Sequence, residues 1–273
     1  MAGALGSRCT AARYASTSGV VAYLAAVQRE PSAPATVARL ASTLRGLYGF
    51  LLDEGVAASD PTAGLAPRRS STRLPVVLSE DQVLALLASP ATEEPPDVRD
   101  RAILELLYGT GVRVSELVGL DVGDVDFDEE LVRVTGKGSK QRLVPLGRGA
   151  AAALRAWLGG PRGALLARGG ASAERGAVFC NLRGRRITRQ GVDLVVRRHA
   201  RRAGLPAATS SHTLRHSCAT HMLARGADVR VIQELLGHAS VGTTQRYTKV
   251  APSHLLDAYR AAHPRAGDAP SAT

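Results

Sequence analysis

One change of hydrophobic period constrains the fold of this 273-residue chain more than any other feature. Residues 130–146, ELVRVTGKGSKQRLVPL, alternate β-branched and polar side chains around a glycine-rich turn, which predicts a β-hairpin. Elsewhere apolar residues recur at helical spacing, and after the hairpin we expect helix to the end, with breaks at Gly204, Gly226 and Gly237. The sequence therefore predicts a mainly α fold with a small antiparallel β-sheet.

The periodic segments fall into two units joined by a linker. Residues 36–55 predict an amphipathic helix that Gly55 ends, with its apolar face made of Leu40, Leu44, Leu47, Tyr48, Leu51 and Leu52. Residues 1–19 have no convincing period, so we expect order to start near Val20. Pro, Ser, Gly and Arg dominate the non-periodic linker region. The expected boundaries are 1–68 for a small helical unit, 69–78 for the linker, 79–264 for a larger unit and 265–273 for a tail.

Local signals place the helices of the larger unit. Ser79 and Gln82 fit a capping box, and a helix over about 98–108 is followed by GTG, which turns the chain into VRVSELVGL. Thr188 can cap a later helix, and Asp228 can cap the helix that Gly237 ends.

The charge of the chain points to a polyanionic partner. Its net charge is +11 and its pI is near 10.4. Such an excess favours nucleic acid or an anionic membrane face, and no apolar run approaches the ~20 residues that span a bilayer. Nucleic acid is the better match, although arginine preference alone carries little information in a chain so rich in arginine and alanine.

Cysteine usage favours a reducing compartment. Cys9, Cys180 and Cys218 are far apart and form neither a disulfide framework nor a CxxC zinc site. We expect a cytoplasmic protein without a targeting peptide, because the weakly apolar run VVAYLAAV continues naturally into a helix.

Two segments invite a metal interpretation, and neither supports it well. HTLRH places His212 and His216 at i,i+4 but lacks the glutamate of HExxH, and Arg215 between them would repel a cation. The acidic run DVGDVDFDEE has Glu129 where a calcium loop needs glycine. We expect no metal and no other cofactor. Taken singly, His212, His216 and His221 could be ordinary helix residues and Tyr247 a core aromatic.

Lysine is rare in this chain and is concentrated in one turn. Only Lys137, Lys140 and Lys249 occur among the 35 basic residues, and two of them lie in GKGSKQ. A flexible turn tolerates any cation. A lysine, unlike an arginine with a pKa above ~12, can also give up a proton and act as a general acid.

Four segments in order, GTGVRVSEL, GKGSK, HTLRHSCATHML and LGHASVGTTQRYTKV, together resemble the catalytic domain of tyrosine site-specific recombinases. The resemblance is greatest to the Xer-type chromosome dimer resolvases and covers about Val20 to the C-terminus. It implies a SAM-like core-binding domain, a short helical DNA clamp, before the catalytic domain. It also implies an active site of six residues, none of them substituted here: Arg113, Lys137, His212, Arg215, His238 and Tyr247.

The resemblance implies DNA strand transfer without metal or ATP. Arg113, Arg215 and His238 would stabilise the charge on the non-bridging phosphate oxygens. Tyr247 would attack phosphorus with His212 as general base, and Lys137 would protonate the departing 5′ oxygen. Glu116, three residues after Arg113, is either an orienting residue for that arginine or a solvated helix acid.

Eight arginines lie between residues 183 and 202, and such a run is usually a solvated face. Here a backbone-tracking surface for duplex DNA is expected, with six candidates: Arg183, Arg185, Arg186, Arg189, Arg197 and Arg198.

The resemblance also implies an assembly. Leu255, Leu256 and Tyr259 form a stripe that on its own indicates core packing. By resemblance it belongs to a helix that each subunit hands to its neighbour in a DNA-bound tetramer. That tetramer could contain a related recombinase subunit and be activated by a DNA translocase, in chromosome partition and cell division.

The N-terminal region departs from the family pattern, since only about two of four clamp helices are recognisable. A misassigned start, a natural truncation or a divergent clamp would each account for this. The alternatives to an Xer role are an integrase or transposon recombinase acting at another site, and a DNA-binding protein that cannot bring two sites together.

Overall fold

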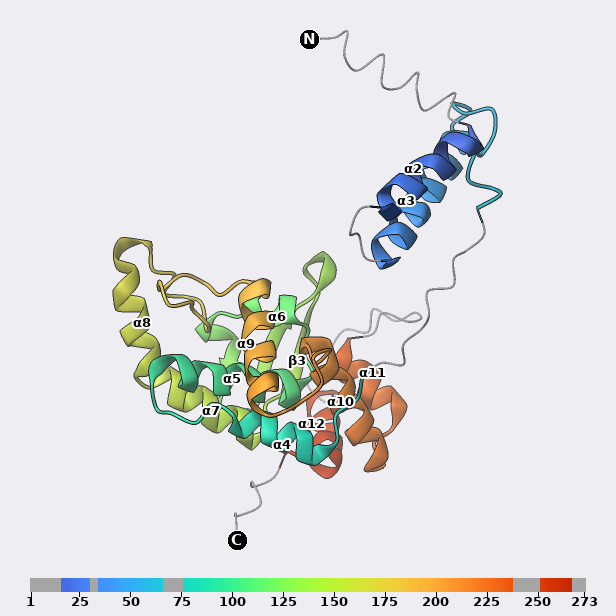
Figure 1. Cartoon of the computed structure of the whole chain (residues 1–273). Helices are drawn as coiled ribbons and strands as arrows, with labels where there is room; N and C mark the ends of the chain where they lie inside the picture. The colour runs from blue at the N-terminus through green and yellow to red at the C-terminus, as the bar shows by residue number, and fades with distance from the viewer. Residues whose placement is uncertain (1–15, 30–33, 66–75, 238–250, 267–273) are drawn as a thin grey trace. The chain divides into compact units, whose positions relative to one another are not determined.

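The computed structural model describes residues 16–29, 34–65, 76–237 and 251–266 (Figure 1). The chain divides into two compact units, Met1–Leu74 and Pro75–Thr273. The division falls inside the predicted linker 69–78, and the domain roles themselves stay a prediction. Within the described residues no helix is both long and apolar enough to span a bilayer.

In the described part of the first unit, α2 (Thr17–Arg29) packs against α3 (Pro34–Asp53). The predicted helix over 36–55 is confirmed, and Gly55 follows it with φ +65°. Val20, Tyr48 and Ala57 form its small buried cluster. Of the predicted apolar face of α3, Tyr48 is buried and Leu40, Leu44 and Leu51 are half-buried, whereas Leu47 and Leu52 are exposed.

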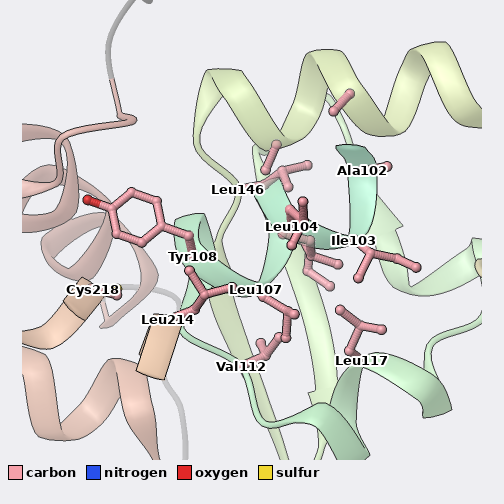
Figure 2. Packing of buried hydrophobic residues seen from close by; sticks show 14 of the residues in the cluster. Ala102, Ile103, Leu104, Leu107, Tyr108, Val112, Leu117, Leu146, Leu214 and Cys218 are labelled. Carbon is pink, nitrogen blue, oxygen red and sulfur yellow. The ribbon is translucent and has the colours of Figure 1, made fainter. Parts of the chain in front are cut away.

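The second unit is built around α5 (Pro95–Thr110), which is buried along almost its whole length from Val98. The prediction of a helix over 98–108 is confirmed, and prolines at its first two positions, which suit a helix start, extend it to residue 95. Figure 2 shows Ile103, Leu104 and Leu107 of α5 inside the core, with side chains of neighbouring elements around them. A helix that is buried on all sides needs such a covering, and the buried charges of α5, such as Arg99 and Asp100, pair with each other.

The other described helices of the unit are α4 (Glu80–Ala88), α6 (Val114–Gly119), α7 (Arg148–Leu158), α8 (Pro161–Gly169), α9 (Arg189–Arg202), α10 (Ser211–Ala224), α11 (Val229–Leu236) and α12 (Ala251–Ala262). Of these, α4, α7, α8, α9 and α10 pack directly on α5. Short 3-10 turns occupy Val122–Asp124, Lys137–Ser139 and Gly170–Ser172. In Figure 1, α8 lies at one end of the unit and α10, α11 and α12 lie at the other.

The predicted hairpin is confirmed as β2 (Leu131–Thr135) paired antiparallel with β3 (Gln141–Pro145). A third strand that the sequence analysis did not predict, β1 (Val125–Asp126), pairs with β2. The described fold is thus mainly α with a small antiparallel sheet, as predicted.

Helix boundaries follow the predicted signals. The Ser79–Gln82 capping box is present at α4, the Thr188 side chain accepts from Gly191 N at α9, and the Asp228 side chain accepts from Arg230 N at α11. The predicted glycine breaks are confirmed at residues 204, 226 and 237, all with left-handed φ.

The expectation of helix throughout the region after the hairpin is wrong between α8 and α9. Residues 173–188 form turns and isolated bridges, including Cys180 with Arg186. The Asn181 side chain accepts the backbone N–H groups of Arg183 and Arg185, and Gly184 has φ +71°. A side chain that bonds the backbone nearby competes with helix, which explains this turn.

Candidate active site

Arg113 stands where α5 ends and α6 begins. Gly111 terminates α5 with φ +60°, and Arg113 is the N-cap of α6. Its backbone N–H donates to Glu116 Oε2 at 2.8 Å, and its Nη1 donates to Oε1 of the same carboxylate at 3.0 Å. With a side chain 38% exposed, Arg113 is fixed at its base and open at its outer side.

Arg215 lies deeper, on α10. The side chain is buried, with Nη1 donating to Gly111 O and Nη2 to Leu236 O, both at 2.5 Å. Burial, and then the positive charge of Arg113, lowers the pKa of Arg215 to about 10. It therefore stays a cation at neutral pH.

Glu116 holds the site together as a buried anion. It is 2% exposed and accepts hydrogen bonds from both Arg113 and Arg142. Burial acts to raise its pKa, but the hydrogen bonds from Arg142 and Arg113 outweigh this and hold the pKa below its usual range. The structure therefore excludes the alternative that Glu116 is a solvated helix acid.

The C-terminal end of α11 is where the arginines meet. Arg142 Nε donates to Leu235 O at 3.2 Å, Arg215 to Leu236 O, and Arg113 Nη2 to Gly237 O at 3.0 Å. The last carbonyls of a helix lack intrahelical partners and carry the negative end of its dipole, which attracts cations. Three arginines from three elements thus fix the chain immediately before His238.

Arg142 is a site residue that the sequence analysis missed. A signal for it exists in the hairpin, because Arg142 is the cross-strand partner of Val134, which is fully buried. Directly opposed residues lie on the same face of a sheet, so this register places a cation on the core side of β3.

The remaining predicted catalytic residues are only partly described. His212 lies exposed in the first turn of α10. Lys137 begins the 3-10 turn of the hairpin, and its side chain is not among those described. His238 and Tyr247 lie outside the described residues. Of the six, the structure brings Arg113 and Arg215 together, and the convergence of the other four stays a prediction.

Two other tyrosines of the second unit are unsuited to be nucleophiles. Tyr108 OH lies 2.9 Å from His221 Nδ1, and Tyr259 OH donates to Gly109 O at 2.8 Å. Both hydroxyls are buried, and burial raises the pKa of each above its usual value. Tyr247 is the third tyrosine between residues 75 and 273 and remains the candidate.

The candidate DNA-binding arginines divide into two groups. Arg186 donates to Val118 O and Leu120 O and pairs with Asp121, while Arg198 pairs with buried Asp100. The other four are exposed, in the turn before α9 or on α9 itself: Arg183, Arg185, Arg189 and Arg197. Within the described residues, the side chains of these four form none of the hydrogen bonds or ion pairs that fix Arg186 and Arg198.

A buried acidic cluster joins α5 to α9. Asp97, Asp100 and His199 bring their ligand atoms close enough for a cation, and they form the one such group among the described residues. Arg99 and Arg198 already bond Asp100, and His199 Nε2 lies 3.0 Å from the same carboxylate. With its charge met by these partners, the cluster serves as a structural network.

The predicted stripe on α12 packs against its own chain. Leu255 and Tyr259 are buried in the main core, and the Tyr259 ring stacks on His263 with centroids 4.6 Å apart. Tyr259 OH reaches α5 through Gly109 O. Exchange of this helix with a neighbouring subunit stays a prediction.

The sequence pattern described as the phage integrase family matches residues 76–254. The tyrosine recombinase XerD of Bifidobacterium longum is 44% identical over 248 residues, which cover 89% of this chain and 80% of that protein. XerD of Mycobacterium tuberculosis is 49% identical over 235 residues, covering 85% of this chain and 75% of that protein.

A solved structure shares the fold. The XerH site-specific recombinase, in a post-cleavage complex with its palindromic difH substrate, superposes with a TM-score of 0.65 at 21% identity. The match covers 90% of this chain and 69% of that one. At this identity the likeness concerns the fold alone.

Proposed function

The chain belongs to the phage integrase family of tyrosine recombinases, and from this premise we propose that it is an Xer-type site-specific DNA recombinase. The observation that carries the proposal is the pair of arginines, Arg113 and Arg215, fixed together at the end of α11 one residue before His238. Two planar forks that remain charged suit the non-bridging oxygens of a phosphodiester.

The reaction proceeds by attack of the Tyr247 oxygen on phosphorus. His212 takes the phenolic proton, the bond from phosphorus to the 5′ oxygen breaks, and Lys137 gives that oxygen a proton. The products are a 3′-phosphotyrosine and a free 5′-hydroxyl, which can attack in reverse on another strand. Arg113, Arg215 and His238 stabilise the charge that develops on the non-bridging oxygens.

Strand transfer here needs neither a metal ion nor ATP. The phosphotyrosine ester conserves the energy of the broken bond, so rejoining requires no further energy source. The charge that a metal would neutralise in phosphoryl transfer is met by Arg113 and Arg215, supported by the buried position of Arg215.

Exchange of both strands between two duplexes breaks four phosphodiesters, and one tyrosine per subunit therefore requires four subunits. We infer a tetramer on duplex DNA, with α12 joining neighbours and with a related recombinase subunit and a DNA translocase as partners. The exposed arginines near and on α9 support DNA contact.

The cellular role we propose is chromosome dimer resolution in the cytoplasm, as part of chromosome partition and cell division. The relatives from Bifidobacterium longum and Mycobacterium tuberculosis bear the name XerD and support an Xer role. Cys180 and Cys218 are free, buried thiols, which suits a reducing compartment.

A nicked suicide duplex tests this function, because loss of a short fragment after cleavage traps the covalent intermediate. We expect the wild-type protein to form an adduct with a duplex carrying a recombination site from its own genome, seen by denaturing gel. The Tyr247→Phe variant should bind the same DNA and form none. An adduct of equal yield with Tyr247→Phe would contradict the mechanism, and binding without any wild-type adduct would favour a DNA-binding protein.

A further inference from the structure

The side chain of Arg142 makes more hydrogen bonds than that of Arg113 or Arg215. Its side chain, 11% exposed, donates from Nη1 to Glu116 Oε1 at 2.7 Å and from Nη2 to Oε2 at 3.0 Å. These are the two parallel bonds of a fork on a carboxylate. Its third nitrogen, Nε, donates to Leu235 O on α11.

Gly237 is fitted to this guanidinium. A Cβ at position 237 would lie 3.0 Å from both Cζ and Nε of Arg142. The residue also has φ +62°, which glycine adopts without steric cost. Glycine thus ends α11 and at the same time leaves the space that Arg142 occupies. The Arg142 guanidinium therefore packs directly against the end of the helix.

The bonds of Arg142 connect the elements that carry the proposed catalytic groups. It lies on β3, five residues beyond Lys137 on the same hairpin. Through Glu116 it reaches Arg113, and through Leu235 it reaches the segment that leads to His238. We propose that Arg142 is a positioning residue for strand cleavage, which holds Glu116 and Arg113 in register with the end of α11 and with the turn end of the hairpin.

This inference rests on the proposed function of the site, but it assigns Arg142 no contact with DNA. All three of its guanidinium nitrogens donate to protein oxygens, and the side chain is nearly buried. A lysine offers one compact cation and cannot make the parallel pair of bonds. The geometry therefore predicts an effect on the rate of cleavage and none on DNA affinity.

Arg99 provides a matched control. It too makes two bonds to a buried carboxylate, Asp100, and one to a backbone carbonyl, Cys180 O at 3.1 Å, but outside the arginine cluster. Arg142→Ala and Arg99→Ala should both lower the melting temperature. With enzyme saturating a nicked suicide duplex, we expect Arg142→Ala to cleave about 100-fold more slowly, the effect of a small misplacement of reacting groups, and Arg99→Ala to cleave at the wild-type rate.

A pH profile separates positioning from general loss of structure. The charged groups that face Glu116 are Arg113, Arg142 and Arg215, from α6, β3 and α10. Removal of Arg142 takes away a hydrogen bond and a positive charge that lower the pKa of Glu116, so this pKa should rise and protonation at falling pH should release Arg113. Cleavage by Arg142→Ala should therefore decline more steeply below neutral pH than cleavage by wild type. Glu116→Gln in the same background should remove this extra decline.

The possible results are distinguishable. No adduct from the wild-type protein means that the proposed function fails. A wild-type adduct together with an Arg142→Ala rate and pH profile equal to those of Arg99→Ala overturns the role of Arg142 alone. If Arg142→Ala does not fold, Arg142→Lys decides, because the retained cation supports folding. A folded Arg142→Lys protein should cleave more slowly than wild type at equal DNA affinity, and an unchanged rate would overturn the proposal.

Discussion

Arg113 and Arg215 share a proposed chemical role but differ in how much of the structure depends on them. Arg113 is 38% exposed in its side chain, whereas Arg215 is buried and satisfies the carbonyls of Gly111 and Leu236. Removing a buried donor leaves its acceptors without partners, which costs about 1–3 kcal/mol for each group. We therefore expect substitution of Arg113 and of Arg215 to differ in the effect on stability and to have similar effects on cleavage.

We predict that Arg113→Ala and Arg215→Ala each slow cleavage by about 100- to 1,000-fold, the usual loss when one transition-state donor is removed. Only Arg215→Ala should also lower the melting temperature strongly. Single-turnover cleavage and thermal unfolding measure the two effects. Arg133→Ala, which removes an exposed arginine paired with Asp124, is the control and should change neither. A wild-type cleavage rate in Arg113→Ala would contradict its assignment.

At the scale of single residues, the sequence predicted the site residues that belong to a recurrent motif. It missed those whose role depends on the tertiary structure. Arg113 and Arg215 were expected together and are found together. Arg142 was not expected, because its role depends on the hairpin register and on the distant end of α11. Arg186 was expected at DNA, but it bonds carbonyls of α6 and its flank from a turn whose conformation the sequence analysis did not foresee.

At the scale of elements, local chemistry predicted most helices. Ser79, Thr188 and Asp228 begin helices with side-chain caps, and Gly237 ends one, because each acts through backbone groups within a few residues. The strand β1 and the turns between α8 and α9 were missed. A two-residue strand has no period, and the second region depends on long-range pairing such as Asp121 with Ala177.

The end of α12 should make stability depend on pH. His263 is buried, its Nδ1 accepts the Arg265 backbone N–H, and its Nε2 lies 3.3 Å from Tyr108 O. Burial, the largest cause, lowers the pKa of His263 to about 3. Protonation of Nδ1 would break the bond from Arg265, so the folded protein keeps this ring neutral, whereas in the unfolded chain the pKa of the ring is near the ordinary histidine value of about 6.5.

Because the unfolded state binds the proton first, His263 destabilises the fold as pH falls from about 6.5 toward 3, with a limiting slope of about 1.4 kcal/mol per pH unit. Chemical denaturation at pH 7 and pH 5 should show this loss. Glutamine cannot titrate, so the unfolding free energy of His263→Gln should fall less steeply with pH, by up to the contribution of one proton, about 1.4 kcal/mol per pH unit. His254→Gln, at an exposed site of α12, should keep the pH dependence of the wild-type protein. Equal slopes for His263→Gln and wild type would contradict the burial argument.

At the scale of the whole molecule, the net charge of +11 predicts DNA binding that weakens steeply with salt. The structure sharpens this prediction by separating arginines that face solvent from those bonded within the fold. Arg189→Ala, at the exposed start of α9, should reduce the slope of log affinity against log salt by about 1. Arg186→Ala should leave that slope unchanged, since Arg186 already pairs with Asp121 and Glu174.

Binding titrations over a series of salt concentrations test this difference, with circular dichroism to confirm that both variants are folded. Equal reductions in slope for Arg189→Ala and Arg186→Ala would contradict the division of the arginines into two groups.

The central claim is that Tyr247 forms a 3′-phosphotyrosine with DNA, and its most direct test is to locate the covalent bond. The adduct from a nicked suicide duplex is digested with protease and nuclease, and the nucleotide-bearing peptide is sequenced by mass spectrometry. We predict a single modified peptide, with a 3′-nucleotide on Tyr247 and a free 5′-hydroxyl on the released strand. A nucleotide on any other residue, or a 5′ linkage, would contradict the account.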